Sequence, residues 1–368
     1  MARRLLMSRV FVASGLALAL LVTFILPARA GDPVETALDY LAAQQQPDGG
    51  FTNGFSEGSD LGTTCDVVLA IAAAGQDASG WRSSDDRSPL DYLAAQVAAG
   101  AVDTVGMKAK VVLALLATGQ DPAGFAGHDL LAELEAAYDG ETGSYGSNIF
   151  DQALVVLALF NAGRPVPEGA ARYLLDNQCT DGAWALFGGT TPGTGDTNTT
   201  ALAIQALLVT DHRDEIGTAF AYLHRVQNTD GGFPYQNPSA YGTDTDANST
   251  AYVLQALLAA GESLADWTPA GTDPVGALAA LYDPSSGAFF WQAAYPFPNV
   301  LATAQAIPAF QGYTFVSLPR VGAAFPPQAV SAVPLLPESG GAATLPLAVI
   351  LAGVALLGAG QVLRRRAR

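Results

Sequence analysis

The stretch Gln178-Cys179-Thr180-Asp181-Gly182-Ala183-Trp184 decides the fold, because its pattern of Gln, Gly and an aromatic residue recurs along the 368-residue chain. The spacing Gln-x-x-x-Gly-x-aromatic also begins at Gln45 and Gln227. Three weaker copies begin at Gln96, Asp139 and Asp283. Successive glycines of the six copies lie between 39 and 56 residues apart, a period that is typical of proteins built from repeated pairs of helices.

Each repeat predicts one amphipathic helix before the glycine and one apolar helix after it. In the first copy Val34, Ala37, Leu38 and Leu41 recur at helical spacing, and glycine then provides the left-handed residue that ends a helix. The apolar runs that follow the glycines cover residues 67–74, 109–117, 153–162, 200–208, 251–260 and 301–310. Apolar helices alternating with half-polar ones favour an inner ring and an outer ring. The sequence therefore predicts an all-α fold, an (α/α)6 toroid of six helix-pair repeats.

The repeated turn resembles that of a known superfamily. Residues 178–184 are similar to the QW motif of squalene-hopene cyclase and other class II terpenoid cyclases, and Asp48-Gly49-Gly50-Phe51 and Asp230-Gly231-Gly232-Phe233 resemble the same turn in protein prenyltransferase β subunits. The resemblance extends from about Asp32 to Tyr313. It implies a toroid in which Gln bonds backbone groups at a helix end and the aromatic ring packs over the turn. Such a fold supports several functions, so the function has to be argued from a site.

The two ends of the chain indicate export and attachment to the cell surface. Residues 1–30 combine early arginines, an apolar run and an Ala-x-Ala close, which is typical of a secretory signal peptide, with an uncleaved membrane helix as the alternative. Residues 344–368 contain an apolar run of membrane-spanning length and a basic tail, which predict a transmembrane anchor with the rest of the chain outside the cell.

Between the toroid and the anchor, the Pro- and Ala-rich residues 317–343 predict an extended stalk, which leaves residues 31–316 for the toroid. Leu336-Pro337-Glu338-Ser339-Gly340 resembles the Leu-Pro-x-Thr-Gly sorting signal of Gram-positive surface proteins, with Ser in place of Thr. Either a sortase joins the protein to the cell wall at this signal, or the helix remains the final anchor.

The charge of the chain excludes one class of partner. Lysine and arginine number 17 against 34 acidic residues, and eight of the basic residues lie in the two terminal segments, which contain no acid. The remaining ectodomain has a net charge of about −25. Because such a surface repels polyanions, nucleic acid is not expected as a partner.

Two cysteines, Cys65 and Cys179, are present. Outside the cell an even number of cysteines is typical of a disulfide, and the alternative is two buried thiols in different repeats.

Polar residues precede or open all six apolar runs, and they have two interpretations. As helix N-caps they satisfy the free N–H groups of the first turn. Gathered around one rim, they would also form a ring that binds a small or extended ligand, with nearby aromatic side chains supplying apolar contact. The candidate ligand-binding residues are Trp184, Phe187, Asp196, Asn198, Phe233, Tyr235, Asn248 and Trp291.

An enzymatic alternative rests on Asp244-Thr245-Asp246-Ala247, which resembles the Asp-x-Asp-Asp acid motif of class II terpenoid cyclases. The resemblance implies that Asp246 protonates an alkene or epoxide with Asp244 as its partner. Clustered carboxylates are needed because protonation of carbon demands a strong, preorganised acid. The final Asp of the motif is replaced by Ala247, which removes part of that cluster.

No metal or other cofactor is expected. The prenyltransferase zinc site needs an Asp-x-Cys spacing that Cys65 and Cys179 do not provide. Residues 305–314, Gln-Ala-Ile-Pro-Ala-Phe-Gln-Gly-Tyr-Thr, resemble the end of the α-domain of intrinsic factor and transcobalamin, which implies a corrinoid as one candidate ligand. A binding module at the cell surface is the favoured interpretation, with the cyclase-like enzyme and a purely structural surface protein as alternatives.

Overall fold

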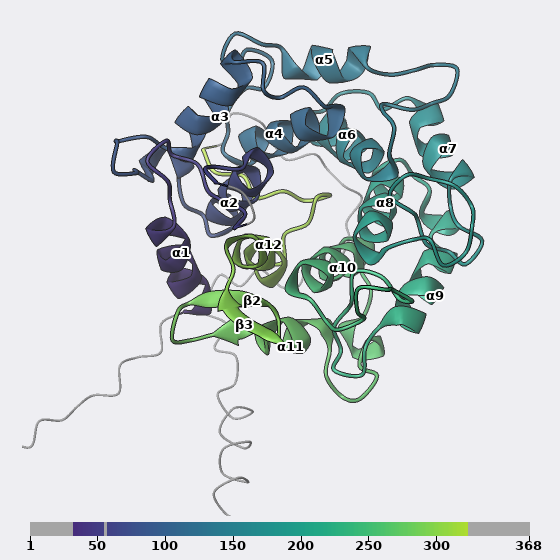
Figure 1. The fold of residues 1–368 in the computed structure, drawn as a ribbon. Coiled ribbons are helices and arrows are strands. Elements are labelled where there is room, and N and C mark those ends of the chain that lie inside the picture. Colours follow the sequence, from purple (N-terminus) through teal and green to yellow (C-terminus); the bar gives the residue numbers. More distant parts are fainter. Residues whose placement is uncertain (1–31, 55–56, 323–368) are drawn as a thin grey trace, which may run out of the picture.

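The fold is a closed ring of helix pairs in a computed structural model that describes residues 32–54 and 57–322 (Figure 1). Each inner helix packs against the next, and the last packs against the first. The inner helices are α2 (Leu61–Ala73), α4 (Val105–Ala117), α6 (Ile149–Asn161), α8 (Thr197–Val209), α10 (Ala247–Ala260) and α12 (Val300–Phe310). The outer helices are α1 (Pro33–Ala43), α3 (Pro89–Ala98), α5 (Leu130–Ala136), α7 (Glu168–Asp176), α9 (Gly217–Val226) and α11 (Pro274–Ala279). The predicted (α/α)6 toroid is confirmed.

The inner helices begin several residues before most of the apolar runs that predict them, because their first turns are polar yet helical. In α8, for example, Asp196 Oδ1 accepts a hydrogen bond of 2.7 Å from the N–H of Thr199. The residues that cap the six inner helices in this way are Asp60, Thr104, Asn148, Asp196, Asp246 and Asn299. The capping interpretation of the polar residues is therefore correct for five inner helices, whereas α2 is capped by Asp60, three residues before the expected Thr63-Thr64 pair.

The Gln-Gly-aromatic turn joins an outer helix to the inner helix that follows it. Gln178 Nε2 donates a hydrogen bond of 2.9 Å to the carbonyl of Gly182, whose φ of 94° is the left-handed conformation that glycine permits. The N–H of Trp184 donates to Thr200 Oγ1 on α8 at 3.0 Å, and its indole N–H donates to the carbonyl of Leu174 on α7 at 2.7 Å. The motif is thus a fixed joint between the two layers.

The same glycines also connect neighbouring repeats. A Cβ atom at Gly182 would collide with the carbonyl of Thr218 at the start of α9, so the absence of a side chain allows close contact with the next outer helix. Corresponding contacts occur between Gly49 and Ser88, Gly143 and Gly169, Gly231 and Thr272, and Gly287 and Thr36. The last pair joins the sixth repeat to α1, and a hydrogen bond between the Thr36 and Tyr282 hydroxyls reinforces this closure of the ring.

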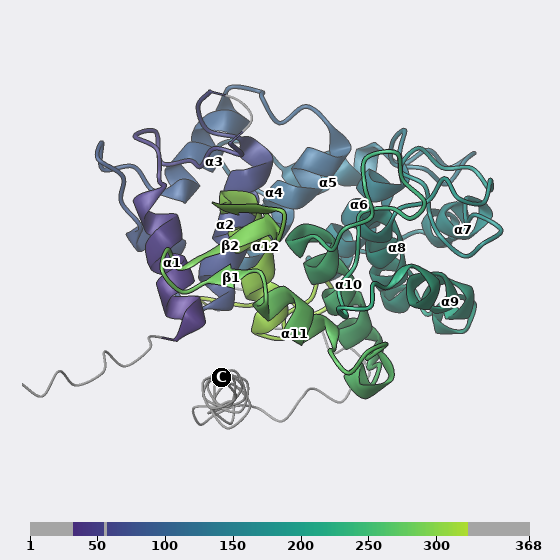
Figure 2. The same ribbon diagram turned by 60° about the horizontal axis from the view of Figure 1, so that its bottom comes forward.

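A small antiparallel sheet between α11 and α12 departs from the all-α prediction (Figure 2). Its strands β1 (Tyr282–Asp283), β2 (Ala288–Gln292) and β3 (Tyr295–Pro298) pair in chain order. The N–H of Phe289 donates to Thr303 Oγ1 on α12 at 2.9 Å, and Gln292 pairs with Asp246 at the start of α10. The β2–β3 hairpin is therefore held against two inner helices.

The chain after α12 crosses the centre of the ring (Figure 1) and closes it at the C-terminal ends of the inner helices. The N–H of Phe315 donates to Gln205 Oε1 at 2.9 Å, Asn161 Nδ2 donates to the Phe315 carbonyl at 2.8 Å, and the N–H of Val321 donates to the carbonyl of Ala117 at 2.9 Å. Leu318 is buried. Residues 317–322, expected to begin an extended stalk, instead pack on the toroid, because its apolar lumen has to be covered at this end.

None of the helices within residues 32–54 and 57–322 has the length and apolar character needed to cross a bilayer. The predicted signal peptide, the rest of the stalk with its sorting signal and the predicted anchor lie outside the described residues.

Candidate functional site: a cavity at the mouth of the toroid

A cavity of about 450 Å³ opens where the N-terminal ends of the inner helices meet. This volume lies in the range of small-molecule sites, and all six inner helices contribute to its wall. The lining residues are Asn53, Asp60, Gly62, Thr63, Asp66, Lys110, Phe150, Asn198, Tyr235, Asp246, Asn248, Ser249, Tyr252, Trp291, Leu301 and Gln305.

The floor of the cavity is a chain of polar contacts that joins four inner helices. Lys110 Nζ on α4 lies 2.8 Å from Asp66 Oδ2 on α2, and Gln305 Nε2 on α12 donates to the same oxygen at 3.0 Å. Asn248 Nδ2 on α10 donates to Gln305 Oε1 at 2.8 Å. These side chains are oriented by one another before any ligand arrives, so a ligand meets donors and acceptors in fixed positions.

The floor lysine remains charged despite its burial. Burial by itself lowers the pKa of Lys110, but the Asp66 carboxylate beside it acts in the opposite direction, and the net pKa is raised. Burial also raises the pKa of Tyr252, so its phenol stays neutral. The floor therefore presents an ion pair next to a neutral hydroxyl.

Below this floor the lumen is filled. The ring of Tyr252 stacks on that of Phe315 from the closing segment, with centroids 5.9 Å apart and planes at 14°. The space left between this segment and the floor measures about 20 Å³, roughly one water molecule. The site is consequently a cup with a polar floor, and it does not continue into an apolar tunnel through the described toroid.

Asp246, the candidate acid, lies on the wall of the cavity as the N-cap of α10. Its Oδ1 accepts from the N–H of Ser249 at 2.7 Å and its Oδ2 accepts from Ser249 Oγ at 2.9 Å. Burial raises the pKa of Asp246 to about 6, although the hydrogen bonds from Ser249 partly oppose this. Asp244, its expected partner, is exposed in the preceding loop and does not line the cavity.

Asp196 repeats this arrangement one repeat earlier. It accepts from the N–H and Oγ1 of Thr199 at 2.7 and 2.8 Å, and burial raises its pKa to about 6 as well. Asp196 is not among the residues that line the cavity. Since both carboxylates have the same geometry, capping alone explains the surroundings of Asp246.

The other candidate ligand-binding residues divide into two groups. Asn198, Tyr235, Asn248 and Trp291 line the cavity together. The prediction differs from the structure for the rest. Trp184 and Phe233 are 0% exposed because they fill the repeat turns, and Phe187 is 80% exposed in the loop before α8, away from the cavity lining.

Of the two interpretations of the cysteines, the buried thiols are correct and the possible disulfide is not formed. Cys65 lies on α2 and Cys179 in the turn of the fourth repeat, and both are buried free thiols. Burial raises the pKa of Cys65 to about 12, which keeps the thiol protonated and unreactive.

Several cavity residues escape the sequence analysis, notably Asp60, Asp66, Lys110, Tyr252 and Gln305. Asp66 and Lys110 could have been recognised from the sequence as candidate site residues, because each places a charge inside or beside an otherwise apolar inner-helix sequence. Within residues 32–54 and 57–322, no three His, Cys, Asp or Glu side chains gather in a way that would hold a metal ion.

Comparison with known proteins agrees with this architecture. The profile of the squalene-hopene cyclase C-terminal domain matches residues 131–277. Comparison with curated proteins by sequence gives no match.

Solved structures share the fold at low sequence identity. The type II terpene cyclase MstE from Scytonema is 15% identical, with a TM-score of 0.55 over 77% of this chain and 97% of that one. Unsaturated glucuronyl hydrolase from Bacillus sp. GL1 is 14% identical, with a TM-score of 0.54 over 76% and 95% of the two chains. A protein from Actinoplanes is 15% identical, with a TM-score of 0.53 over 77% and 99%. The chain therefore has the α/α toroid fold that type II terpene cyclases and unsaturated glucuronyl hydrolase share.

Proposed function

We propose that this protein binds a small, neutral, polyhydroxylated ligand, a sugar ring, in the mouth cavity of the toroid. The observation that supports this most is the preorganised chain of Asn248, Gln305, Asp66 and Lys110 across the cavity floor. Carboxylate, carboxamide and ammonium groups in fixed positions match the neighbouring hydroxyls of a sugar, each of which both donates and accepts hydrogen bonds.

The aromatic residues of the wall complete the match. Tyr235 and Trp291 line the cavity while remaining partly exposed, so their ring faces are available to the C–H groups of a sugar. The carboxylates of Asp60, Asp66 and Asp246 outnumber the one lysine among the lining residues, which disfavours an anionic ligand.

We place this activity at the cell surface. This part of the proposal rests on the leader-like residues 1–30 and the apolar, basic-ended residues 344–368. The described chain ends at the C-terminal side of the inner helices, where Val321 bonds Ala117, and the cavity opens at the other side. An anchor beyond residue 322 would therefore leave the cavity facing away from the membrane.

A binding panel tests the proposal. Purified full chain is titrated by calorimetry with neutral monosaccharides, a uronic acid, a corrinoid and a linear isoprenoid. We expect a neutral sugar to bind and Gln305→Ala to weaken its binding about tenfold, because the change removes the amide that orients Asn248 and one of the two donors that hold Asp66. Gln120→Ala removes the same amide group just beyond the C-terminal end of α4 and serves as the matched control. Binding of the corrinoid or the isoprenoid alone would refute the proposal.

A cyclase-like enzyme is the second candidate, and the raised pKa of Asp246 at the cavity wall is the observation that favours it. A variant of MstE is known in complex with geranylgeranyl dihydroxybenzoate as substrate, which makes that compound a suitable probe. Asp246→Asn removes the proton donor but keeps the cap, since Asn148 and Asn299 cap two other inner helices. Turnover of the probe by the native chain, abolished in Asp246→Asn, would establish the enzyme; we expect no turnover.

A further inference from the structure

Exposed aromatic side chains gather in the loops that lead into three consecutive inner helices. Phe187 precedes α8, Tyr235 and Tyr241 precede α10, and a third group precedes α12. The third group consists of Trp291, Tyr295 and Phe297, all on the β2–β3 hairpin. Single exposed aromatic residues are ordinary, but an exposed pair of stacked rings, one of which lines a cavity, is typical of a binding surface.

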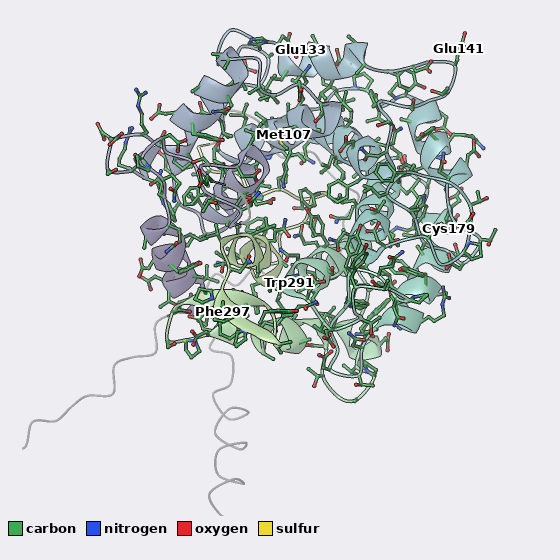
Figure 3. All side chains as sticks on the ribbon, in the orientation of Figure 1. Met107, Glu133, Glu141, Cys179, Trp291 and Phe297 are labelled. Atoms are coloured by element: carbon green, nitrogen blue, oxygen red, sulfur yellow. The ribbon has the colours of Figure 1, made fainter. Side chains whose placement is uncertain are left out.

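Trp291 and Tyr295 form a platform that continues the cavity wall. Their ring centroids lie 5.4 Å apart with planes at 28°, and they are 40% and 54% exposed. Trp291 lines the cavity, whereas Tyr295 lies outside it. Figure 3 shows Trp291 over the junction of α10 and α12, with Phe297 farther from the axis of the ring.

The platform is held in place by the inner helices. The N–H of Phe289 on β2 donates a hydrogen bond to Thr303 on α12, and the Phe289 carbonyl accepts one of 3.1 Å from the N–H of Asn299. Gln292 forms a β-bridge with Asp246 at the start of α10. The stacked rings therefore keep a fixed position relative to the polar floor of the cavity, and a ligand that contacts both does not have to order the hairpin first.

We propose that Trp291 and Tyr295 form a second subsite, on which a further ring of an extended neutral glycan packs while its terminal ring occupies the cavity. The inference rests on the proposed function and adds to it that the ligand is a chain. Sugar rings present faces of C–H groups at regular intervals along a glycan, and a fixed, exposed aromatic surface next to a pocket with a polar floor is complementary to two successive rings.

The charges and the orientation of the toroid favour a glycan over a lipid surface. The ectodomain has a net charge of about −25, which repels anionic head groups. The described chain leaves the toroid beside Ala117, at the end opposite to the hairpin and the cavity. An acyl chain in the cavity would bury the three lining carboxylates against apolar groups, which is unfavourable.

Calorimetry with the full chain tests the second subsite. The probes are neutral oligosaccharides of one to six rings, in glucose, mannose and N-acetylglucosamine series, with oligogalacturonate as the anionic comparator. We expect affinity in one neutral series to rise about tenfold between one ring and three, because packing on the platform adds apolar contact. Tyr295→Ala should remove this gain, whereas Tyr295→Phe, which keeps the ring, should retain it.

Tyr241→Ala is the matched control, since Tyr241 is exposed in a neighbouring loop and does not line the cavity. Far-UV circular dichroism and melting curves establish that each variant is folded.

Equal affinity for one ring and for longer chains, or the full gain in affinity retained by Tyr295→Ala, would overturn the second subsite and leave sugar binding intact. Failure of every saccharide would instead refute the proposed function. Binding to phosphatidylcholine vesicles that Tyr295→Ala abolishes would assign the platform to a membrane and overturn the inference.

Discussion

Asp196 and Asp246 show how one position serves the same purpose in different repeats. Each caps an inner helix with a buried carboxylate, and at the equivalent positions of α6 and α12 the caps are Asn148 and Asn299. A neutral amide therefore satisfies the same N–H groups. The charged carboxylates are destabilised at these positions, because burial raises the pKa of both to about 6.

This difference predicts an unusual dependence of stability on pH. A carboxyl group whose pKa is raised from 3.8 to about 6 on folding binds more protons in the folded state, so its contribution is present below pH 3.8 and is lost as pH rises through 6. The double variant Asp196→Asn/Asp246→Asn cannot lose this stability. When the pH is raised from 4 to 7.5, we therefore expect its free energy of unfolding to increase, relative to that of the native chain, by roughly 2 kcal/mol per site. Urea unfolding at both pH values measures this, and parallel pH profiles would contradict it.

Gly182 predicts a second effect at the residue scale. Gly182→Ala forces a Cβ into the Thr218 carbonyl and also strains a φ of 94°, whereas Gly100 has a φ of 70° with open space around it. We expect Gly100→Ala to cost about 1 kcal/mol and Gly182→Ala about 3 kcal/mol in free energy of unfolding. Denaturant unfolding compares the two, and equal losses would show that the contact between repeats contributes nothing.

At the scale of elements, the repeat pattern predicts the helices well and their boundaries less well. The apolar runs identify all six inner helices, but their starts are placed late where polar residues such as Thr199 occupy the first turn. The β2–β3 hairpin is missed because the template of the other repeats has only a loop at that place. Composition also assigns Leu318 to a stalk, although the open end of the lumen buries it.

The candidate site is predicted only where it coincides with the rim. Asn198 and Asn248 are found because they stand at helix starts, but the other floor residues, Asp66, Lys110 and Gln305, are not. Asp66 and Gln305 are 239 residues apart in sequence, and they meet only because α12 packs against α2 when the ring closes. A contact of that kind follows from the completed fold and not from any local pattern.

Phe315 lies in the segment after α12, residues 311–322, that closes the ring, and it allows the contribution of this segment to stability to be tested. It is buried, stacks on Tyr252 and replaces solvent in the lumen. We expect Phe315→Ala to lower the free energy of unfolding by about 3 kcal/mol, because the emptied space cannot collapse between six rigid helices. Phe187→Ala, at an 80% exposed site, should change it by less than about 0.5 kcal/mol. Urea unfolding of both variants is the measurement; equal effects would mean that the segment is only loosely attached.

At the scale of the molecule, packing alone closes the ring. Cys65 and Cys179 are free, and the joint between the first and last repeats is made by the packing of α12 on α2, together with the Gly287–Thr36 contact and the Tyr282 hydroxyl. We therefore expect the melting temperature to be unaffected by dithiothreitol, and thiol titration in denaturant to find two free thiols per chain. A melting temperature that falls with reductant would indicate a covalent link.

The contact between Gly287 and Thr36 sets a limit on how this architecture can change. An open solenoid lengthens by one unit at either end and needs special terminal repeats to cover its exposed faces. Here the sixth unit already meets the first, so there is no free end to which a seventh could be added, and loss of one would uncover two apolar faces. Diversification is left to the connecting loops, and three of them already carry the exposed aromatic residues.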